Sequence, residues 1–74
     1  MPLDVELFGQ LASGVQRRQN LTLDSPVRVL EVARNLGLNP EEVGLITIDG
    51  VQSEMEDIVH PNCRVCFFPY MSGG

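Results

Sequence analysis

The chain has 74 residues, enough for one small domain with a thin hydrophobic core. With 43% hydrophobic residues it is too apolar to be disordered, yet no apolar run approaches the roughly 18 residues of a membrane span. Without such a run we expect no membrane, and because its net charge of −5 repels phosphate backbones we expect no nucleic acid among its partners. With no basic-then-apolar leader either, the composition favours a small cytoplasmic carrier or binding domain.

All of the basic residues are arginines, and the chain contains no lysine. Schiff-base chemistry and isopeptide attachment to a side-chain amine are therefore excluded. Cys63 and Cys66 lie too close in sequence to close a useful loop as a disulfide. We interpret them as reduced thiols of a cytoplasmic protein.

The first 23 residues predict a β-hairpin. Residues 3–7 alternate apolar and polar side chains, which is the period of a half-buried strand. Residues 9–14 are interpreted as a loop between two glycines. Residues 16–23 then predict a second strand that pairs with the first.

The period changes to that of a helix after residue 24. Ser25 is predicted to cap the helix, with Pro26 in its first turn, where a missing N–H costs nothing. Gly37 is placed to end the helix in a left-handed conformation. Apolar side chains recur at helical spacing and form one stripe, so the helix packs on a partner surface through Val29, Val32, Ala33 and Leu36.

The second half of the chain predicts one capped turn and three further strands. The turn covers residues 39–42, and a strand over residues 45–48 leads into Asp49-Gly50, a strong hairpin signal. A short return strand begins at residues 51–52. After a turn at residues 60–62, the last strand covers residues 64–70 and is rich in β-branched and aromatic residues.

This order predicts an α+β domain with the β-grasp (ubiquitin-like) arrangement. One main helix packs on one face of a mixed sheet of four to five strands, with the first and last strands side by side in its centre. We expect this domain to occupy residues 1–70 and a flexible tail to occupy residues 71–74.

The open face of the predicted sheet carries an aromatic patch. If the apolar positions of the first strand face the helix, then Asp4, Glu6 and Phe8 face solvent. The same alternation puts Arg64, Cys66 and Phe68 on the open side of the last strand. Phe8 and Phe68 are thus predicted to form a surface that binds a partner.

The chain ends with Met71, Ser72, Gly73 and Gly74. Glycines without Cβ atoms can enter a channel too narrow for other residues, and four residues reach about 13–14 Å. The functional group at the tip is the carboxylate of Gly74. Adenylation with ATP would give it a good leaving group, and a sulfur nucleophile could then leave a thiocarboxylate. The domain supplies no base, metal or nucleophile, so we expect it to be a carrier and not an enzyme.

The ending Phe67-Phe68-Pro69-Tyr70-Met71-Ser72-Gly73-Gly74 resembles that of the MoaD/ThiS family of ubiquitin-like sulfur carriers, and among them the molybdopterin synthase small subunit. The layout of the whole chain is similar, but only these eight residues are specific. The resemblance implies that Gly74 is adenylated and thiocarboxylated, and that Gly73, Ser72, Met71, Phe68 and Phe8 bind partners.

The same resemblance implies three partners and no bound cofactor. An E1-like adenylating enzyme would use ATP on Gly74, a sulfur donor protein would supply sulfur, and the molybdopterin synthase large subunit would receive it. The sulfur would then serve molybdenum cofactor synthesis. Two alternatives stay open: a ThiS-like carrier for thiamine thiazole or another acceptor, and a non-covalent β-grasp interaction module.

A metal site is not predicted. His60, Cys63 and Cys66 lack the fourth ligand of a structural zinc site, and two cysteines three apart point to opposite faces of a strand. The acidic residues at positions 54, 56 and 57 are interpreted as a hydrated loop. The acidic surface as a whole is expected to match a basic surface on an activating enzyme.

Overall fold

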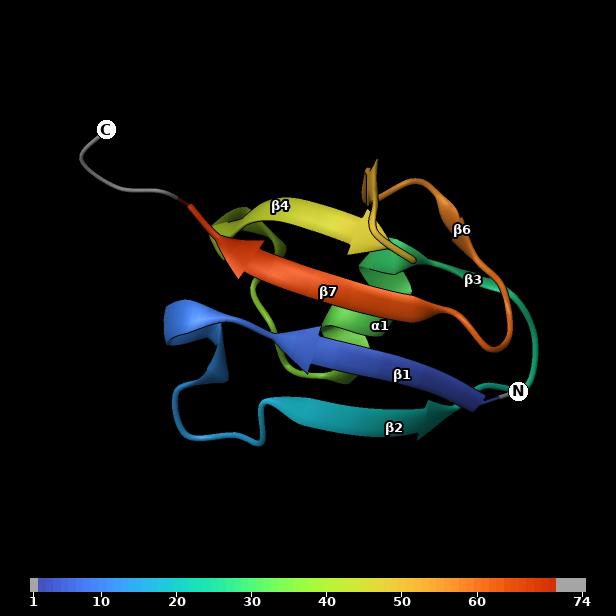
Figure 1. Cartoon of the computed structure of the whole chain (residues 1–74), viewed down its shortest axis with the longest axis horizontal. Helices are drawn as coiled ribbons and strands as arrows, with labels where there is room; N and C mark the ends of the chain where they lie inside the picture. The colour runs from blue at the N-terminus through green and yellow to red at the C-terminus, as the bar shows by residue number, and fades with distance from the viewer. Residues whose placement is uncertain (1, 71–74) are drawn as a thin grey trace.

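The computed structural model describes residues 2–70, which form a five-stranded sheet with one α-helix against one face (Figure 1). The strand order is β2-β1-β7-β4-β5, and only the central β1–β7 pair is parallel. The strands are β1 (Pro2–Leu7), β2 (Arg18–Thr22), β4 (Val43–Ile48), β5 (Val51–Ser53) and β7 (Arg64–Pro69). The predicted architecture is confirmed, including the central position of the first and last strands.

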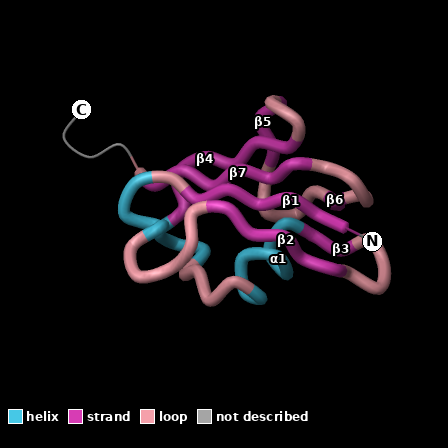
Figure 2. The backbone as a smooth tube through the Cα atoms, turned by 60° about the horizontal axis from the view of Figure 1, so that its bottom comes forward, coloured by secondary structure: helices cyan, strands magenta, loops and turns pink. Residues whose placement is uncertain are grey.

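The core lies between the sheet and helix α1 (Val29–Asn35), which occupies one side of the strands in Figure 2. Strands β1 and β7 direct alternate apolar side chains toward the helix, and Phe67 and Leu7 are completely buried. The helix packs against these side chains through its predicted apolar stripe. Within the stripe, Val29, Val32 and Ala33 are buried and Leu36 is half-buried. Burial of these side chains is the main stabilising contribution in so small a domain.

The predicted start of the helix was wrong. The helix begins at Val29, and residues 27–28 form a short strand β3 (Val27–Arg28) that pairs with β6 (Ile58–Val59). The first free helix N–H groups, those of Val29 and Leu30, donate to the carbonyls of Asp57 and Met55 at 2.9 and 3.0 Å. Because a distant loop satisfies these donors, no side-chain cap from Ser25 is needed.

The predicted end of the helix is confirmed. Gly37 has a φ of +78°, and the Leu38 N–H donates to the Ala33 carbonyl at 2.9 Å, which closes the helix with a Schellman motif. The capped turn is also present, as the 3₁₀ helix η2 (Pro40–Glu42), in which the Asn39 side chain accepts from the Glu41 N–H. These elements carry the chain from the helix into β4.

Two predicted connections, the turn at Asp49-Gly50 and the loop at residues 9–14, are both present. Asp49 and Gly50 both have positive φ, as a two-residue hairpin turn of type I′ requires, so this prediction is confirmed. The predicted loop at residues 9–14 contains a 3₁₀ helix, η1 (Gly9–Ala12), whose Leu11 is buried in the core.

No helix within residues 2–70 is long and apolar enough to cross a membrane.

Candidate functional site

The open face of the sheet, on the side opposite α1, has an aromatic end and a charged end. In the parallel β1–β7 pair, Asp4 lies opposite Arg64 and Glu6 lies opposite Cys66. Phe8 follows β1, while Phe68 lies near the end of β7 and opposite Leu45 of β4. The charged residues therefore gather where β7 begins, and the aromatic residues gather where it ends.

The aromatic end is built by a stacked pair of rings. The centroids of Phe8 and Phe68 are 4.5 Å apart, and the ring planes differ by 10°. The Phe8 N–H donates to the Phe67 carbonyl at 3.0 Å, which holds Phe8 beside β7 after β1 has ended. Both rings are half-buried, so the prediction that they adjoin on one open surface is confirmed.

A cation lies above this aromatic pair. The guanidinium carbon of Arg17 is 5.9 Å from the Phe8 ring centroid, at the outer limit of a cation–π contact. Sequence reasoning missed this contact because it placed Arg17 inside a predicted strand over residues 16–23 and assigned no face to that strand, whereas β2 begins at Arg18. The pair thus presents an apolar surface with a positive rim.

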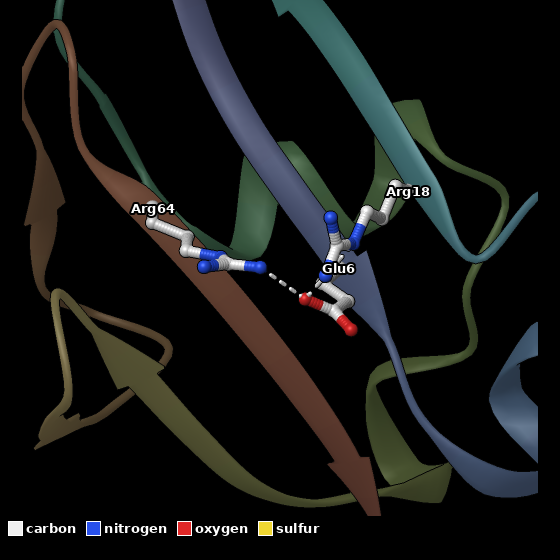
Figure 3. Close-up of polar contacts among 3 residues, drawn as sticks. All are labelled: Glu6, Arg18 and Arg64. Atoms are coloured by element: carbon white, nitrogen blue, oxygen red, sulfur yellow. Dashed lines mark hydrogen bonds and ion pairs between the residues drawn. The ribbon is translucent and has the colours of Figure 1, made fainter.

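Glu6 lies at the charged end, and its predicted exposure was wrong. It is only 7% exposed although it lies on the open face. Figure 3 shows the reason: Arg64 reaches it from β7 with a hydrogen bond and ion pair, and Arg18 lies over it from β2. The Arg18 Nε is 3.6 Å from the same carboxylate oxygen of Glu6. Two long side chains therefore cover one carboxylate across three strands.

The three residues border a shallow groove of about 310 Å³ that also includes Asp4, Gln19 and Asn20. Its walls are polar, and the Glu6 carboxylate neutralises part of the positive charge of its two arginines. The groove is an extension of the open face and holds no group of nucleophiles. Its lining offers charged and amide side chains for polar contacts.

Charge is divided unequally between this face and the rest of the domain. Arg17, Arg18 and Arg64, three of the five arginines, flank the open face together with Asp4 and Glu6, and Asp49 lies beside Arg64, whose N–H donates to the Asp49 carboxylate at 2.9 Å. The acidic excess of the protein therefore lies on its other surfaces. The open face is the one part of the described surface where positive charge and aromatic side chains come together.

Two further groups considered in the sequence are the cysteines, for which no site is predicted, and the C-terminal residues, for which one is. Cys63 packs against the hydrophobic core, while Cys66 is half-buried on the open face. Within residues 2–70, no three His, Cys, Asp or Glu side chains come together as a metal site would require. The predicted residues Met71, Ser72, Gly73 and Gly74 lie outside the described part of the chain. The last described residue, Tyr70, is exposed at the end of β7.

Several solved structures have a similar fold. SAMP1 from Haloferax volcanii superimposes with a TM-score of 0.78 and 19% identity, and all of each chain is covered. The two chains therefore share one fold over their whole length. A putative molybdopterin converting factor subunit 1 from Pyrococcus furiosus gives a TM-score of 0.72 at 17% identity, covering 93% of this chain and 97% of that one.

A third similar structure comes from a complex. A chain of the complex of subunits 1 and 2 of the molybdopterin-converting factor from Helicobacter pylori gives a TM-score of 0.65 at 14% identity, and both chains are covered completely. No protein-family model and no curated protein matches the sequence. At these identities the similarity establishes the β-grasp fold.

Proposed function

We propose that the protein is a sulfur carrier that donates sulfur from a thiocarboxylate on Gly74 for molybdopterin synthesis, as the small subunit of a molybdopterin synthase. The observation that carries this proposal is the position of the Ser72-Gly73-Gly74 sequence, which begins four residues after Phe68 of β7, the residue whose ring stacks on Phe8. The similar fold of two molybdopterin-converting-factor structures supports it.

The chemistry follows from the weak reactivity of a carboxylate. The Gly74 carboxylate attacks the α-phosphate of ATP on an E1-like enzyme, which releases pyrophosphate and forms an acyl-adenylate. A persulfide on a sulfur donor protein then attacks the acyl carbon, and AMP leaves. A thiol finally reduces the resulting acyl disulfide to the thiocarboxylate. All catalytic groups belong to the partners, so the protein itself is a carrier and binds no cofactor.

The open face is the surface through which the domain docks. The Phe8–Phe68 pair supplies apolar area near the point where the chain leaves the sheet. Aromatic residues of this kind commonly contribute most of the binding energy of an interface. Arg17, Arg18 and Arg64 supply a positive rim, so this face favours acidic groups on its partner, whereas the expected match to a basic surface applies to the acidic surfaces around it. Both the adenylating enzyme and the large subunit must receive the same tail, so we assign this face to both.

The decisive experiment is the intact mass of the protein after incubation with ATP, an E1-like adenylating enzyme and a persulfide donor. We expect a gain equal to the replacement of one oxygen by one sulfur. Deletion of Gly74, or addition of one alanine after it, should abolish this gain while leaving the circular dichroism spectrum unchanged. An unchanged mass for the natural sequence with a demonstrably active enzyme would contradict the proposal.

The acceptor is tested separately. The loaded protein is mixed with a molybdopterin synthase large subunit and the cyclic pyranopterin precursor, and dithiolene formation is measured. Dithiolene formation supports the molybdopterin assignment. If the protein is loaded but no dithiolene forms, the carrier function is supported and the molybdopterin assignment is rejected in favour of another acceptor.

A further inference from the structure

The end of β7 is enclosed by two glycines that have no room for a side chain. The first is Gly9, which opens η1 directly after Phe8 and has a φ of +57°. A Cβ atom on Gly9 would lie 2.9 Å from the Pro69 Cγ and 3.4 Å from its Cδ. The turn of η1, blue in Figure 1, thus packs directly on the last residue of the β7 arrow.

The second glycine, Gly44, approaches the same point from β4. It is the extra residue of a β-bulge, because Val43 pairs with Pro69 while Leu45 pairs with Phe68. A Cβ atom on Gly44 would lie 2.7 Å from the Tyr70 Cα and 2.9 Å from both the Pro69 carbonyl oxygen and the Tyr70 nitrogen. These neighbours are backbone atoms, so a methyl group would force the chain to move.

The other described glycines differ sharply from these two. A Cβ atom on Gly14, Gly37 or Gly50 would meet no atom within 4 Å. Each of those three also has a positive φ, which explains the glycine without any packing requirement. Gly44, in contrast, has no positive φ, and only the closeness of Pro69 and Tyr70 accounts for its missing side chain.

The residue that a methyl group would displace is Tyr70. Pro69 is held by its pairing with Val43 in the sheet, whereas Tyr70 follows the last paired residue and is 62% exposed. Displacement of Tyr70 would therefore cost little stability. It would change the point and direction from which the chain continues.

We propose that Gly9 and Gly44 are positioning residues that together set the exit of the C-terminal segment from the domain. This inference rests on the proposed function, in which the segment beyond Tyr70 enters the active site of an adenylating enzyme. Four residues reach about 13–14 Å when extended, so a tilt of about 10° at Tyr70 would move the tip by about 2 Å. An error of about 1 Å at a reacting atom can cost about a hundredfold in rate.

The first test measures the displacement directly and needs no enzyme. Backbone amide chemical shifts are recorded for the full chain and for Gly44→Ala. We expect large shift changes at Tyr70 and its neighbours in β4, and small changes at the buried Val65 and Phe67. Unchanged Tyr70 shifts, or equal changes throughout the core, would overturn the inference whether or not the protein carries sulfur.

The second test separates positioning from docking in the loading assay. For Gly44→Ala we expect the adenylation rate at saturating carrier, followed by pyrophosphate release from ATP, to fall about tenfold to a hundredfold. The KM for the carrier should change less than threefold, because the open face that docks is intact. A rise in KM with unchanged kcat would show a docking or stability role and overturn the inference.

The effect of a methyl group at Gly9 can be tested with a matched control at Gly14 and a rescue at Pro69. Gly14→Ala imposes a similar backbone strain, with a φ of +77°, but contacts nothing, so it should load at the natural rate. Gly9→Ala should load about tenfold more slowly because its methyl group meets the Pro69 ring. In a Pro69→Ala background, where that ring is absent, Gly9→Ala should change the loading rate little. The double variant should therefore load at nearly the rate of Pro69→Ala alone. Equal effects of Gly9→Ala and Gly14→Ala would contradict the inference.

If the natural sequence is not loaded at all, the proposed function fails, and the chemical-shift experiment still decides the role of Gly44. If the natural sequence is loaded and Gly44→Ala is loaded at the same rate, only the positioning role fails. The two proposals can therefore be rejected independently.

Discussion

The two faces of the five-stranded sheet use neighbouring residues of the same strands for different purposes. On the face toward α1, β1 and β7 present only apolar side chains, and Val65 and Phe67 are inaccessible to solvent. On the open face, the intervening positions hold a carboxylate covered by two arginines at one end and two stacked phenylalanines at the other.

Under the proposed function, this difference separates stability from recognition within single strands. Phe67 and Phe68 are consecutive, yet the first fills the core and the second stays half-buried beside Phe8. An aromatic ring held at a surface by another ring gains less burial than a core ring, so its placement is better explained by a partner than by folding. The following substitutions test this division.

The largest effect is expected at the inner face. Phe67→Ala should lower the free energy of unfolding by about 3–5 kcal/mol, because it removes a fully buried ring and leaves a cavity. For a domain of this size that loss approaches the whole stability. Urea denaturation followed by circular dichroism measures it, with Phe67→Leu as the milder variant. A loss below about 1 kcal/mol would break the proposed separation.

On the open face the expected effect moves from stability to binding. Phe68→Ala and Phe8→Ala should each weaken binding to the adenylating enzyme about thirtyfold, or about 2 kcal/mol, as aromatic hot spots do. The stability loss should stay at about 1–2 kcal/mol. Calorimetric titration measures the affinity. Val51→Ala, which removes an exposed apolar side chain from β5, is the control and should bind normally.

At the charged end we expect a moderate effect. Glu6→Gln should lower the free energy of unfolding by about 1 kcal/mol, because the covered carboxylate loses its charge while its arginine partners can turn to water. Asp4→Asn changes an exposed carboxylate on the same strand and face, and it should leave stability unchanged. Equal stability of the two variants would show that burial of Glu6 contributes nothing.

The smallest effect on stability is expected for Arg18→Gln. The Arg18 side chain is 75% exposed, so its loss should change stability by less than about 0.5 kcal/mol. Its role on the positive rim predicts a few-fold weaker association with the enzyme at low salt, and this difference should vanish at about 1 M salt. An affinity difference that persists at high salt would indicate a direct, desolvated contact of Arg18.

Much of the fold could be predicted from local patterns. Alternation identified β1 and β7 and assigned their faces correctly, since the period of a strand leaves two choices and the apolar set selects one. Asp49-Gly50 identified the β4–β5 hairpin, because few residue pairs adopt positive φ twice in succession. The same alternation brought Phe8 and Phe68 together on the open face.

Other features depended on contacts between distant segments. The start of α1 was missed because carbonyls of residues 55–57 satisfy its free N–H groups, which local cap signals cannot reveal. The burial of Glu6 was missed because it requires arginines from two other strands. Gly44 lies just before the predicted strand of residues 45–48, so neither its place in a bulge of β4 nor its neighbours Pro69 and Tyr70 could be inferred from the sequence.

By itself, the sequence determined the β-grasp fold, the two faces of the central strands and the residues of the C-terminal segment, because each depends on periodicity or on residue type. Only the tertiary structure decided that Arg18 and Arg64 cover Glu6, that Phe8 stacks on Phe68 at 4.5 Å, and that Gly9 and Gly44 enclose the end of β7. These arrangements join residues far apart in the chain, and their distances are set by strand register and close packing, which local patterns do not encode.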